Sequence, residues 1–232
     1  MNKVVDFIKR VLVYLLGLFI IAIGINVSKM ACLGISPVSS VPRALEVAWG
    51  FTLGQMVIVI YCLLVLAQII VLRKKFRIVN ILGVPVALVF GFMVDLVGID
   101  PNAVGHLLYY FPRPEIYITK LIYLVVSILI IGTGVYTYLK PNLIPMPAEG
   151  LAQAISQVSG KAFGDCKTMV DTGLITIAFL IQFIFLGGIH SFTGDTIVVR
   201  EGTIISALCV GQVVKFIRNH FDKKPKAQDS GK

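Results

Sequence analysis

The stretch at residues 33–54 recurs in altered form at residues 143–164. The first copy reads LGISPVSSVPRALEVAWGFTLG and the second reads LIPMPAEGLAQAISQVSGKAFG. Most identities between the copies and their flanks fall on glycine and proline, which set the shape of the backbone. The identities pair Gly24 with Gly134, Leu33 with Leu143, Pro37 with Pro147, Ala44 with Ala154, Gly50 with Gly160, and Gly54 with Gly164. The pattern predicts a turn and short helix that are used twice.

The match continues near the end of each half, after a longer insertion in the second. It pairs Ala87 with Ala207, Leu88 with Leu208, Gly91 with Gly211, and Val94 with Val214. We therefore divide the chain into repeat one, at residues 11–98, and repeat two, at residues 116–219.

The composition indicates a membrane protein. Hydrophobic residues make up 57% of the chain, charged residues make up 14%, and the mean hydropathy is +0.89. A chain with so few charges cannot cover the surface of a soluble protein of this size. Six apolar runs, most of them near the roughly 20 residues that cross a bilayer, are predicted to span the membrane. They lie at residues 11–27, 55–72, 78–96, 116–139, 168–189 and 203–217.

Two further segments, at residues 37–49 and 147–158, look helical but are too short and too polar to cross. We expect them to be short re-entrant or interfacial helices. Each repeat then contains three spans and one short helix, and because three is odd the second repeat enters the membrane from the opposite side. The predicted fold is an all-α membrane protein with six transmembrane helices, two short re-entrant helices and a 3+3 inverted-topology repeat. It forms a single membrane domain over residues 1–232.

The positive charges set the expected orientation. If the N-terminus is cytoplasmic, most of the 21 lysine and arginine residues fall on the cytoplasmic side, including those at 73–77 and in the basic tail at 220–232. We therefore expect a multi-pass protein of the bacterial cytoplasmic membrane with both termini inside. The net charge of +9 is explained by these cytoplasmic ends, which can touch anionic lipids, and nucleic-acid binding is not expected.

The starts of the two short helices are the first candidate binding positions. Free N–H groups and the positive dipole end of a half-helix bind anions, although both starts could also be ordinary helix caps. Arg43 could hold an anion or extend to the surface, and the polar groups within spans could line a cavity or bond neighbouring helices. The predicted substrate-binding residues are Asn26, Ser36, Pro37, Ser39, Ser40, Arg43, Tyr136, Pro147, Glu149 and Gly150.

Two acids are candidates for coupling to an ion. Asp171 lies inside the fifth predicted span, where carboxylates usually face a cavity. Lys167, one helical turn earlier, offers the alternative of a local ion pair. Glu149, in the first turn of the second short helix, could bind a cation or proton, or could simply match the helix dipole. Asp95 is expected to reach the outer surface, and Gln182 could line a cavity or bond a neighbouring helix.

No catalytic or metal-binding set is apparent. The four cysteines are scattered without a CxxC pair, and His106, His190 and His220 form no triad. We therefore expect no enzyme activity, no metal and no cofactor.

Several short motifs resemble those of a known family. LGISP at residues 33–37 follows a glycine-bearing first span, PAEGL occupies 147–151, and LGG at 186–188 leads through a polar loop to Gly202 and Thr203. Over residues 16–217 the chain resembles the YczE and YitT group of bacterial integral membrane proteins, and YczE more closely. That group tends to carry an acid after each short-helix proline, where this chain has Ser39 and Glu149. The resemblance implies a membrane fold and a transporter-like function but names no substrate.

The sequence leads to one favoured function and two alternatives. We expect a transporter that moves a small polar or anionic solute by alternating access, coupled to protons or sodium. The alternatives are the substrate-binding membrane subunit of an ATPase-driven vitamin or solute importer, and a non-transporting assembly or sensor protein. The expected partners are the solute or ion, membrane lipids and a second copy of the chain.

Overall fold

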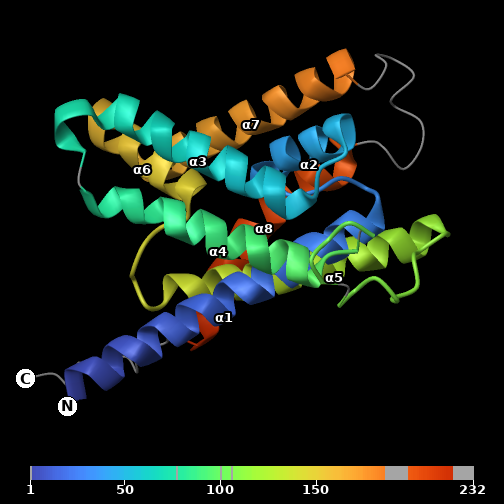
Figure 1. Cartoon of the computed structure of the whole chain (residues 1–232), viewed down its shortest axis with the longest axis horizontal. Coiled ribbons are helices and arrows are strands. Elements are labelled where there is room, and N and C mark those ends of the chain that lie inside the picture. The colour runs from blue at the N-terminus through green and yellow to red at the C-terminus, as the bar shows by residue number, and fades with distance from the viewer. Residues whose placement is uncertain (1, 77, 100, 106, 186–197, 222–232) are drawn as a thin grey trace, which may run out of the picture.

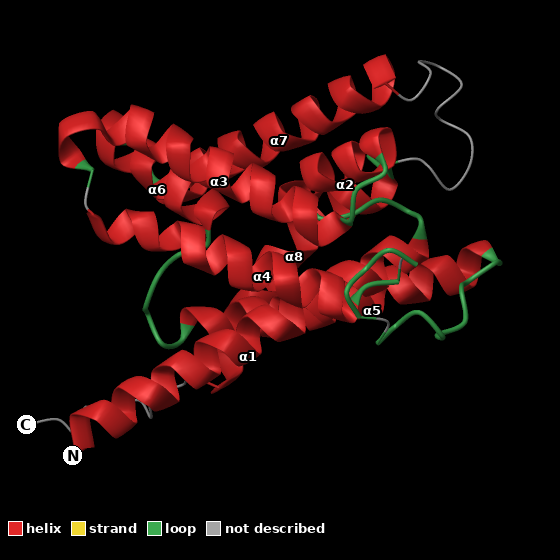
Figure 2. Ribbon diagram, in the orientation of Figure 1, coloured by secondary structure: helices red, strands yellow, loops and turns green. Residues whose placement is uncertain are grey.

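The computed structural model describes residues 2–76, 78–99, 101–105, 107–185 and 198–221. Every regular element in these ranges is a helix, and no strand occurs in them (Figures 1 and 2). The long helices are α1 (Asn2–Ala31), α3 (Leu53–Leu72), α4 (Gly83–Val97), α5 (Tyr117–Leu139), α7 (Phe163–Phe185) and α8 (Glu201–Phe221). The short ones are α2 (Pro37–Trp49), α6 (Pro147–Ser159), and the 3₁₀ helices η1 (Arg73–Lys75) and η2 (Ile78–Leu82).

Five helical segments of the described chain are long and apolar enough to cross a membrane, which indicates a membrane protein. They are Val4–Ala31, Leu53–Leu72, Asn80–Val97, Tyr117–Leu139 and Phe163–Phe185, and they contain most of the first five predicted runs. Residues 186–189 of the fifth run lie outside the described residues. The sixth run lies on α8, which is not among the five. Its charged residues Glu201, Lys215 and Arg218 leave it a shorter apolar stretch.

The two short helices begin and end as the repeated motif predicts. Each contains 13 residues, begins with a proline, and is followed by a glycine in the left-handed conformation. The φ angle is 73° at Gly50 and 70° at Gly160, a region that glycine enters without steric cost. The predicted helix at 37–49 is confirmed, and the one predicted at 147–158 extends one residue further, to Ser159.

Helices α1 and α5 lie side by side and form the most extensive contact between two helices (Figure 1). Three glycines allow this close approach. A Cβ atom at Gly17 would lie 2.5 Å from the backbone nitrogen of Tyr138, one at Gly24 would lie 2.5 Å from Ile131, and one at Gly134 would lie 2.7 Å from Ile21. No larger side chain fits these positions without moving the helices apart.

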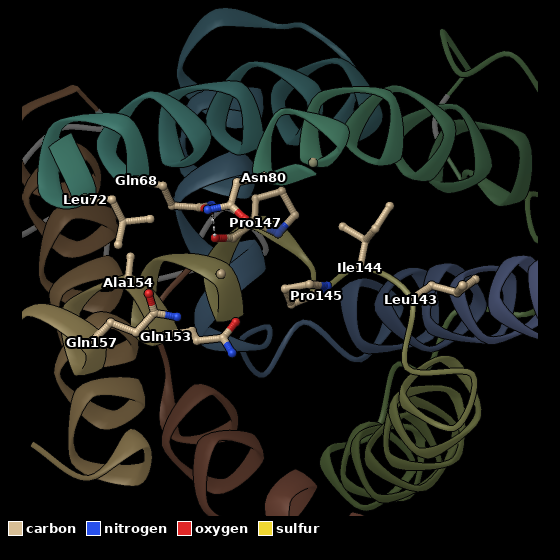
Figure 3. A pocket seen from close by; sticks show the side chains of 12 residues that line it. Gln68, Leu72, Asn80, Leu143, Ile144, Pro145, Pro147, Gln153, Ala154 and Gln157 are labelled. Atoms are coloured by element: carbon tan, nitrogen blue, oxygen red, sulfur yellow. Dashed lines mark hydrogen bonds between the residues drawn. The ribbon is translucent and has the colours of Figure 1, made fainter. Parts of the chain in front are cut away.

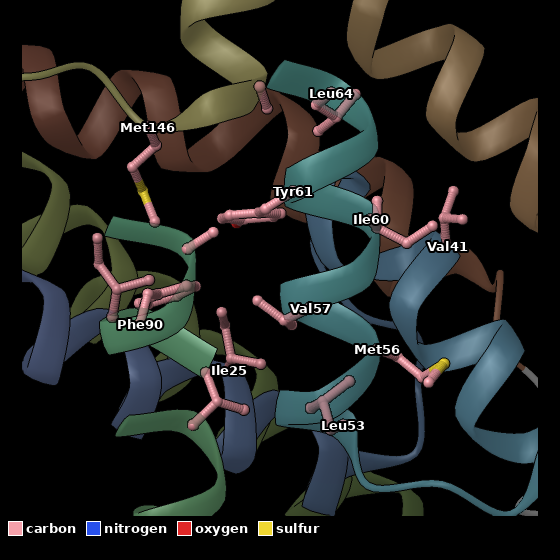
Figure 4. Packing of buried hydrophobic residues seen from close by; sticks show 14 of the residues in the cluster. Ile25, Val41, Leu53, Met56, Val57, Ile60, Tyr61, Leu64, Phe90 and Met146 are labelled. Carbon is pink, nitrogen blue, oxygen red and sulfur yellow. The ribbon is translucent and has the colours of Figure 1, made fainter. Parts of the chain in front are cut away.

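The remaining helices pack around this pair. Helix α4 contacts α1, and helix α8 contacts α5. The short helices cross between the halves, so that α2 packs on α7 and α6 packs on α3 (Figure 1). Figure 4 shows the core between α1, α3 and α4, where the Tyr61 and Phe90 rings stack with centroids 5.7 Å apart and Ile25 and Val57 fill the adjoining space.

Asp95 does not reach the outer surface, so that expectation was wrong. Its residue is only 6% exposed, and its carboxylate accepts hydrogen bonds from the Thr52 hydroxyl at 2.6 Å and the Gly54 N–H at 2.8 Å. The first N–H groups of a helix have no partner within the helix. Asp95 therefore caps the start of α3 with a negative charge supplied by α4.

The α1–α5 contact makes a stability prediction. Gly17→Leu should lower the free energy of unfolding by about 1–3 kcal/mol, because the new side chain overpacks against the Tyr138 backbone. Gly173→Leu is the matched control, since no atom lies within 4 Å of a Cβ built at Gly173 on α7. Thermal unfolding of the purified protein in detergent measures both. Equal melting temperatures for the two variants would contradict the packing account.

Candidate functional site

A central cavity of about 320 Å³ lies where both short helices begin. The first turn of α2 contributes Ser36, Pro37, Val38 and Ser39, and the start of α6 contributes Met146, Ala148 and Glu149. The rest of the wall comes from Ile21, Ile25, Tyr61, Ile131, Val135, Lys167, Thr168, Asp171, Ser206, Ala207, Val210, Gly211 and Val214. Of the predicted site residues, the structure therefore brings together Ser36, Pro37, Ser39, Glu149 and Asp171.

The starts of α2 and α6 carry no side-chain cap in the described structure. The Ser36 hydroxyl lies 3.3 Å from the Ser39 hydroxyl, and the Ser40 hydroxyl is turned to the carbonyl of Pro37 at 2.6 Å. At α6 the capping position is Met146, which has no oxygen to offer. Pro37 and Pro147 have no N–H group, and the Ser39 N–H donates to the Ser36 carbonyl at 3.0 Å. Both positive helix ends nevertheless face the cavity without a side chain that offsets the helix dipole.

Glu149 is held by a tyrosine that sequence reasoning missed. The Tyr138 hydroxyl donates a hydrogen bond to Glu149 Oε2, and the Tyr138 ring meets the Tyr14 ring edge-on at 5.9 Å. Tyr14 in turn donates to the carbonyl of Ile144 at 3.0 Å. The available signal was helical spacing: Tyr138 lies four residues after Gly134, on the face that packs against α1.

Burial makes the carboxyl group of Glu149 a weaker acid than that of an ordinary glutamate. Glu149 lies on α6, outside the membrane-spanning helices, and burial raises the pKa of its carboxyl group to about 7. The negative charge of Asp171 raises this pKa further, while the positive charge of Lys167 lowers it. Glu149 also lines a second cavity, of about 450 Å³, together with Tyr138, Asn142, Gln153 and Phe163. The carboxyl group thus lies between two cavities and titrates near neutral pH.

Lys167 and Asp171 satisfy both interpretations offered by the sequence. The lysine Nζ atom bonds the two carboxylate oxygens of Asp171 at 2.7 and 2.8 Å, so the local ion pair is present. Both side chains also line the central cavity and are partly exposed there. The pair therefore presents one positive and one negative group to whatever occupies the cavity.

Arg43 lies outside the central cavity. Its guanidinium pairs with Glu46 at 2.8 Å, and the same glutamate accepts a hydrogen bond from Lys29 of α1. Glu46 and Lys29 are both buried. The arrangement ties α2 to α1 and leaves Arg43 beside a small separate pocket with Gly34 and Val198.

Other predicted positions also lie elsewhere. The Asn26 amide donates to the carbonyls of Ala22 at 3.1 Å and Val94 at 3.0 Å, which joins α1 to α4. The Tyr136 ring lies 5.7 Å from the Lys140 ammonium and does not line the cavity. Ser40 is completely buried. Gln182 accepts hydrogen bonds from the N–H groups of Val198 and Val199.

Pro147 and Gly150 line a distinct pocket of about 60 Å³ on the α3 side of α6. Figure 3 shows the Gln68 side chain reaching across this pocket, where its amide donates to the Pro147 carbonyl at 3.0 Å. A Cβ atom at Gly150 would lie 2.9 Å from the same amide. These two residues thus fix α6 against α3 and do not face the central cavity.

The described residues contain no group of three or more His, Cys, Asp or Glu side chains that could hold a metal ion. The four cysteines are free. His106 and His190 lie outside the described residues.

The burial of Glu149 predicts a titration. Its carboxyl group should titrate near pH 7, and Tyr138→Phe should raise this midpoint further, because the lost hydrogen bond favours the ionised form. Infrared difference spectra between the wild type and Glu149→Gln isolate this carboxyl group, and the exposed Glu115→Gln is the control. Tyr14, Tyr61, Lys167 and Asp171 also face or act on this region and must stay unchanged in the comparison. A midpoint at the ordinary value of 4.5 would contradict burial.

Comparison with known proteins places the chain among proteins whose function is not established. No solved structure matches it. It is 25% identical over 173 residues to the uncharacterised protein YyaS of Bacillus subtilis strain 168. The aligned stretch covers 73% of this chain and 79% of YyaS. The resemblance to the YczE and YitT group stays a prediction. A family of unknown function, DUF6198, matches residues 8–219, and the chain therefore belongs to the DUF6198 family.

Proposed function

We propose that the protein is a transporter that moves a small polar solute across the membrane by alternating access. The observation that carries this proposal is the convergence of two uncapped half-helix ends, one from each half of the chain, on a single cavity with ionisable side chains. Half-helix ends that meet at a central site are a recurring arrangement of secondary transporters. In a purely structural protein, polar helix ends that face a cavity inside the membrane would be costly and would serve no purpose.

The cavity wall supports an inverted repeat of six spans and two re-entrant helices. Repeat-related positions line it in pairs: Ile21 with Ile131, Ile25 with Val135, Val38 with Ala148, Ser39 with Glu149, and Tyr61 with Asp171. The contacts between helices are also related by the repeat. The contact of α2 with α7 corresponds to that of α6 with α3, and the contact of α1 with α4 corresponds to that of α5 with α8. The cavity thus occupies the position expected of an approximate two-fold axis. Helix α8, with 21 residues or about 30 Å, serves as the sixth span.

The two halves differ in one respect that alternating access requires. In repeat one, α3 and α4 are in close contact, because a Cβ atom at Gly54 would lie 2.2 Å from the carbonyl oxygen of Gly91. The related glycines of repeat two, Gly164 on α7 and Gly211 on α8, have no atom within 4 Å of a built Cβ. The cavity is lined by α7 and α8 on this open side. Exchange of the closed and open arrangements between the halves would expose the cavity alternately.

The arrangement of repeat one shows how repeat two would be held when its helices α7 and α8 come into contact. There, Asp95 of α4 holds the start of α3. The corresponding residue on α8 is Lys215, and the start of α7 carries the exposed Asp165. The charges are opposite in sign, so that Lys215 and Asp165 would attract each other when α7 and α8 close. We place the open side at the cytoplasm, together with the N-terminus and the basic ends of the chain.

Proton coupling fits this cycle best at Glu149. Its pKa near 7 allows it to gain and lose a proton under physiological conditions, and it lies between two cavities. Asp171 takes a supporting role by holding Lys167 in place. Sodium coupling remains the alternative to protons.

Spin labels test the exchange directly. We expect a pair at Met169 and Leu208, on α7 and α8, to show two distances in lipid bilayers. A pair at the related positions Val59 and Leu88, on α3 and α4, should also show two. All four side chains are exposed, so that labelling leaves the core intact. The populations should shift in opposite directions between about pH 6 and about pH 8, on either side of the Glu149 pKa. A single unchanging distance for each pair would contradict alternating access.

A further inference from the structure

Two carboxylates, those of Glu149 and Asp171, line the central cavity. Glu149 contributes a partly buried carboxyl group whose only hydrogen-bond donor among the described residues is Tyr138. Asp171 lines the same wall, but both of its oxygens bond Lys167. The carboxylate of Glu149 is therefore the negative group left to receive a positively charged part of a solute, such as an ammonium.

Positive potential reaches the same cavity from the start of another helix, α2. The first turn of α2, from Ser36 to Ser39, lines the cavity without a side-chain cap. Its Ser36 and Ser39 hydroxyls bond each other and do not neutralise the helix end. A solute carboxylate placed here would be stabilised by the positive dipole end of α2.

The rest of the wall is aliphatic. Ile21 and Ile25 of α1, Ile131 and Val135 of α5, and Val210 of α8 all line the cavity. A hydrocarbon group packed against them would be removed from water, which favours binding. The cavity of about 320 Å³ is at the lower end of the usual size for small-molecule sites.

We infer that the transported solute is a zwitterion with an apolar body, such as an aliphatic α-amino acid. Its ammonium would pair with Glu149, its carboxylate would face the start of α2, and its side chain would lie against the wall formed by α1, α5 and α8. The inference rests on the proposed transport function and specifies the class of solute. It narrows the polar or anionic class expected from the sequence.

Solutes with only one charge fit less well. An anion would use the helix end but would bring no partner for Glu149, and its charge would oppose that carboxylate. A cation would pair with Glu149 but would be repelled by the positive end of α2. A zwitterion satisfies both groups and adds no net charge to a membrane-embedded site, which reduces the cost of desolvation.

Three matched ligands separate these cases. Leucine carries both charges, 3-methylbutylamine lacks the carboxylate, and 4-methylpentanoate lacks the ammonium. Calorimetric titration of the purified full-length protein at about pH 8, where Glu149 is ionised, should show that leucine binds at least about tenfold more tightly than either analogue, which equals about 1.4 kcal/mol. Alanine, valine and phenylalanine extend the series, so that the choice of side chain does not decide the result.

A variant locates the binding group. Glu149→Gln should weaken leucine binding at least about tenfold while 4-methylpentanoate binds more tightly, because the opposing charge is gone, and the exposed Glu115→Gln should change neither. Circular dichroism and the melting temperature show whether each variant is folded. The inference is overturned if an analogue with one charge binds as tightly as leucine, if none of the amino acids binds, or if a folded Glu149→Gln binds leucine normally. Two distances in the spin-label experiment would then retain the transport proposal without the zwitterion.

Discussion

The backbone contact between α1 and α5 is the constraint on which the rest of the arrangement depends. Lipid tails are as apolar as leucine, so that membrane helices are held together by close packing and not by exclusion from water. Gly17, Gly24 and Gly134 permit that packing, and Gly24 and Gly134 are related by the repeat. Because α1 leads into α2 and α5 leads into α6, this one contact also sets where both short helices begin.

Helix ends inside a membrane protein need polar partners, and this chain treats its ends in two ways. The start of α3 is closed by Asp95, whose carboxylate accepts from Thr52 and Gly54. The starts of α2 and α6 have no such partner and face the central cavity. A carboxylate thus caps the start of α3, whereas no side chain caps the starts of α2 and α6. This contrast separates ends that serve stability from ends that are available to a ligand.

Local features of the fold could be predicted from the sequence, whereas side-chain partners could not. The prolines and left-handed glycines of α2 and α6 act within a few residues, and the helices begin as predicted. Arg43 was expected near a solute, but its partner Glu46 and the neighbouring Lys29 are brought together by tertiary packing. Tyr138 was missed in favour of Tyr136 for a related reason, since only the face that packs on α1 distinguishes two tyrosines in one turn. Hydropathy likewise distinguishes α8, which is less apolar, from the other long helices, but it does not show which helices α8 packs against.

Accessibility of one cavity residue from the two sides of a membrane tests alternating access most directly. Ala207 lines the cavity on α8, so that Ala207→Cys, with Cys32, Cys62, Cys166 and Cys209 replaced by serine, provides a single thiol there. A membrane-impermeant maleimide should label this thiol in sealed vesicles of either orientation, because the proposed cycle opens the cavity to each side in turn. Labelling from one side alone, under every condition that supports binding, would contradict the account.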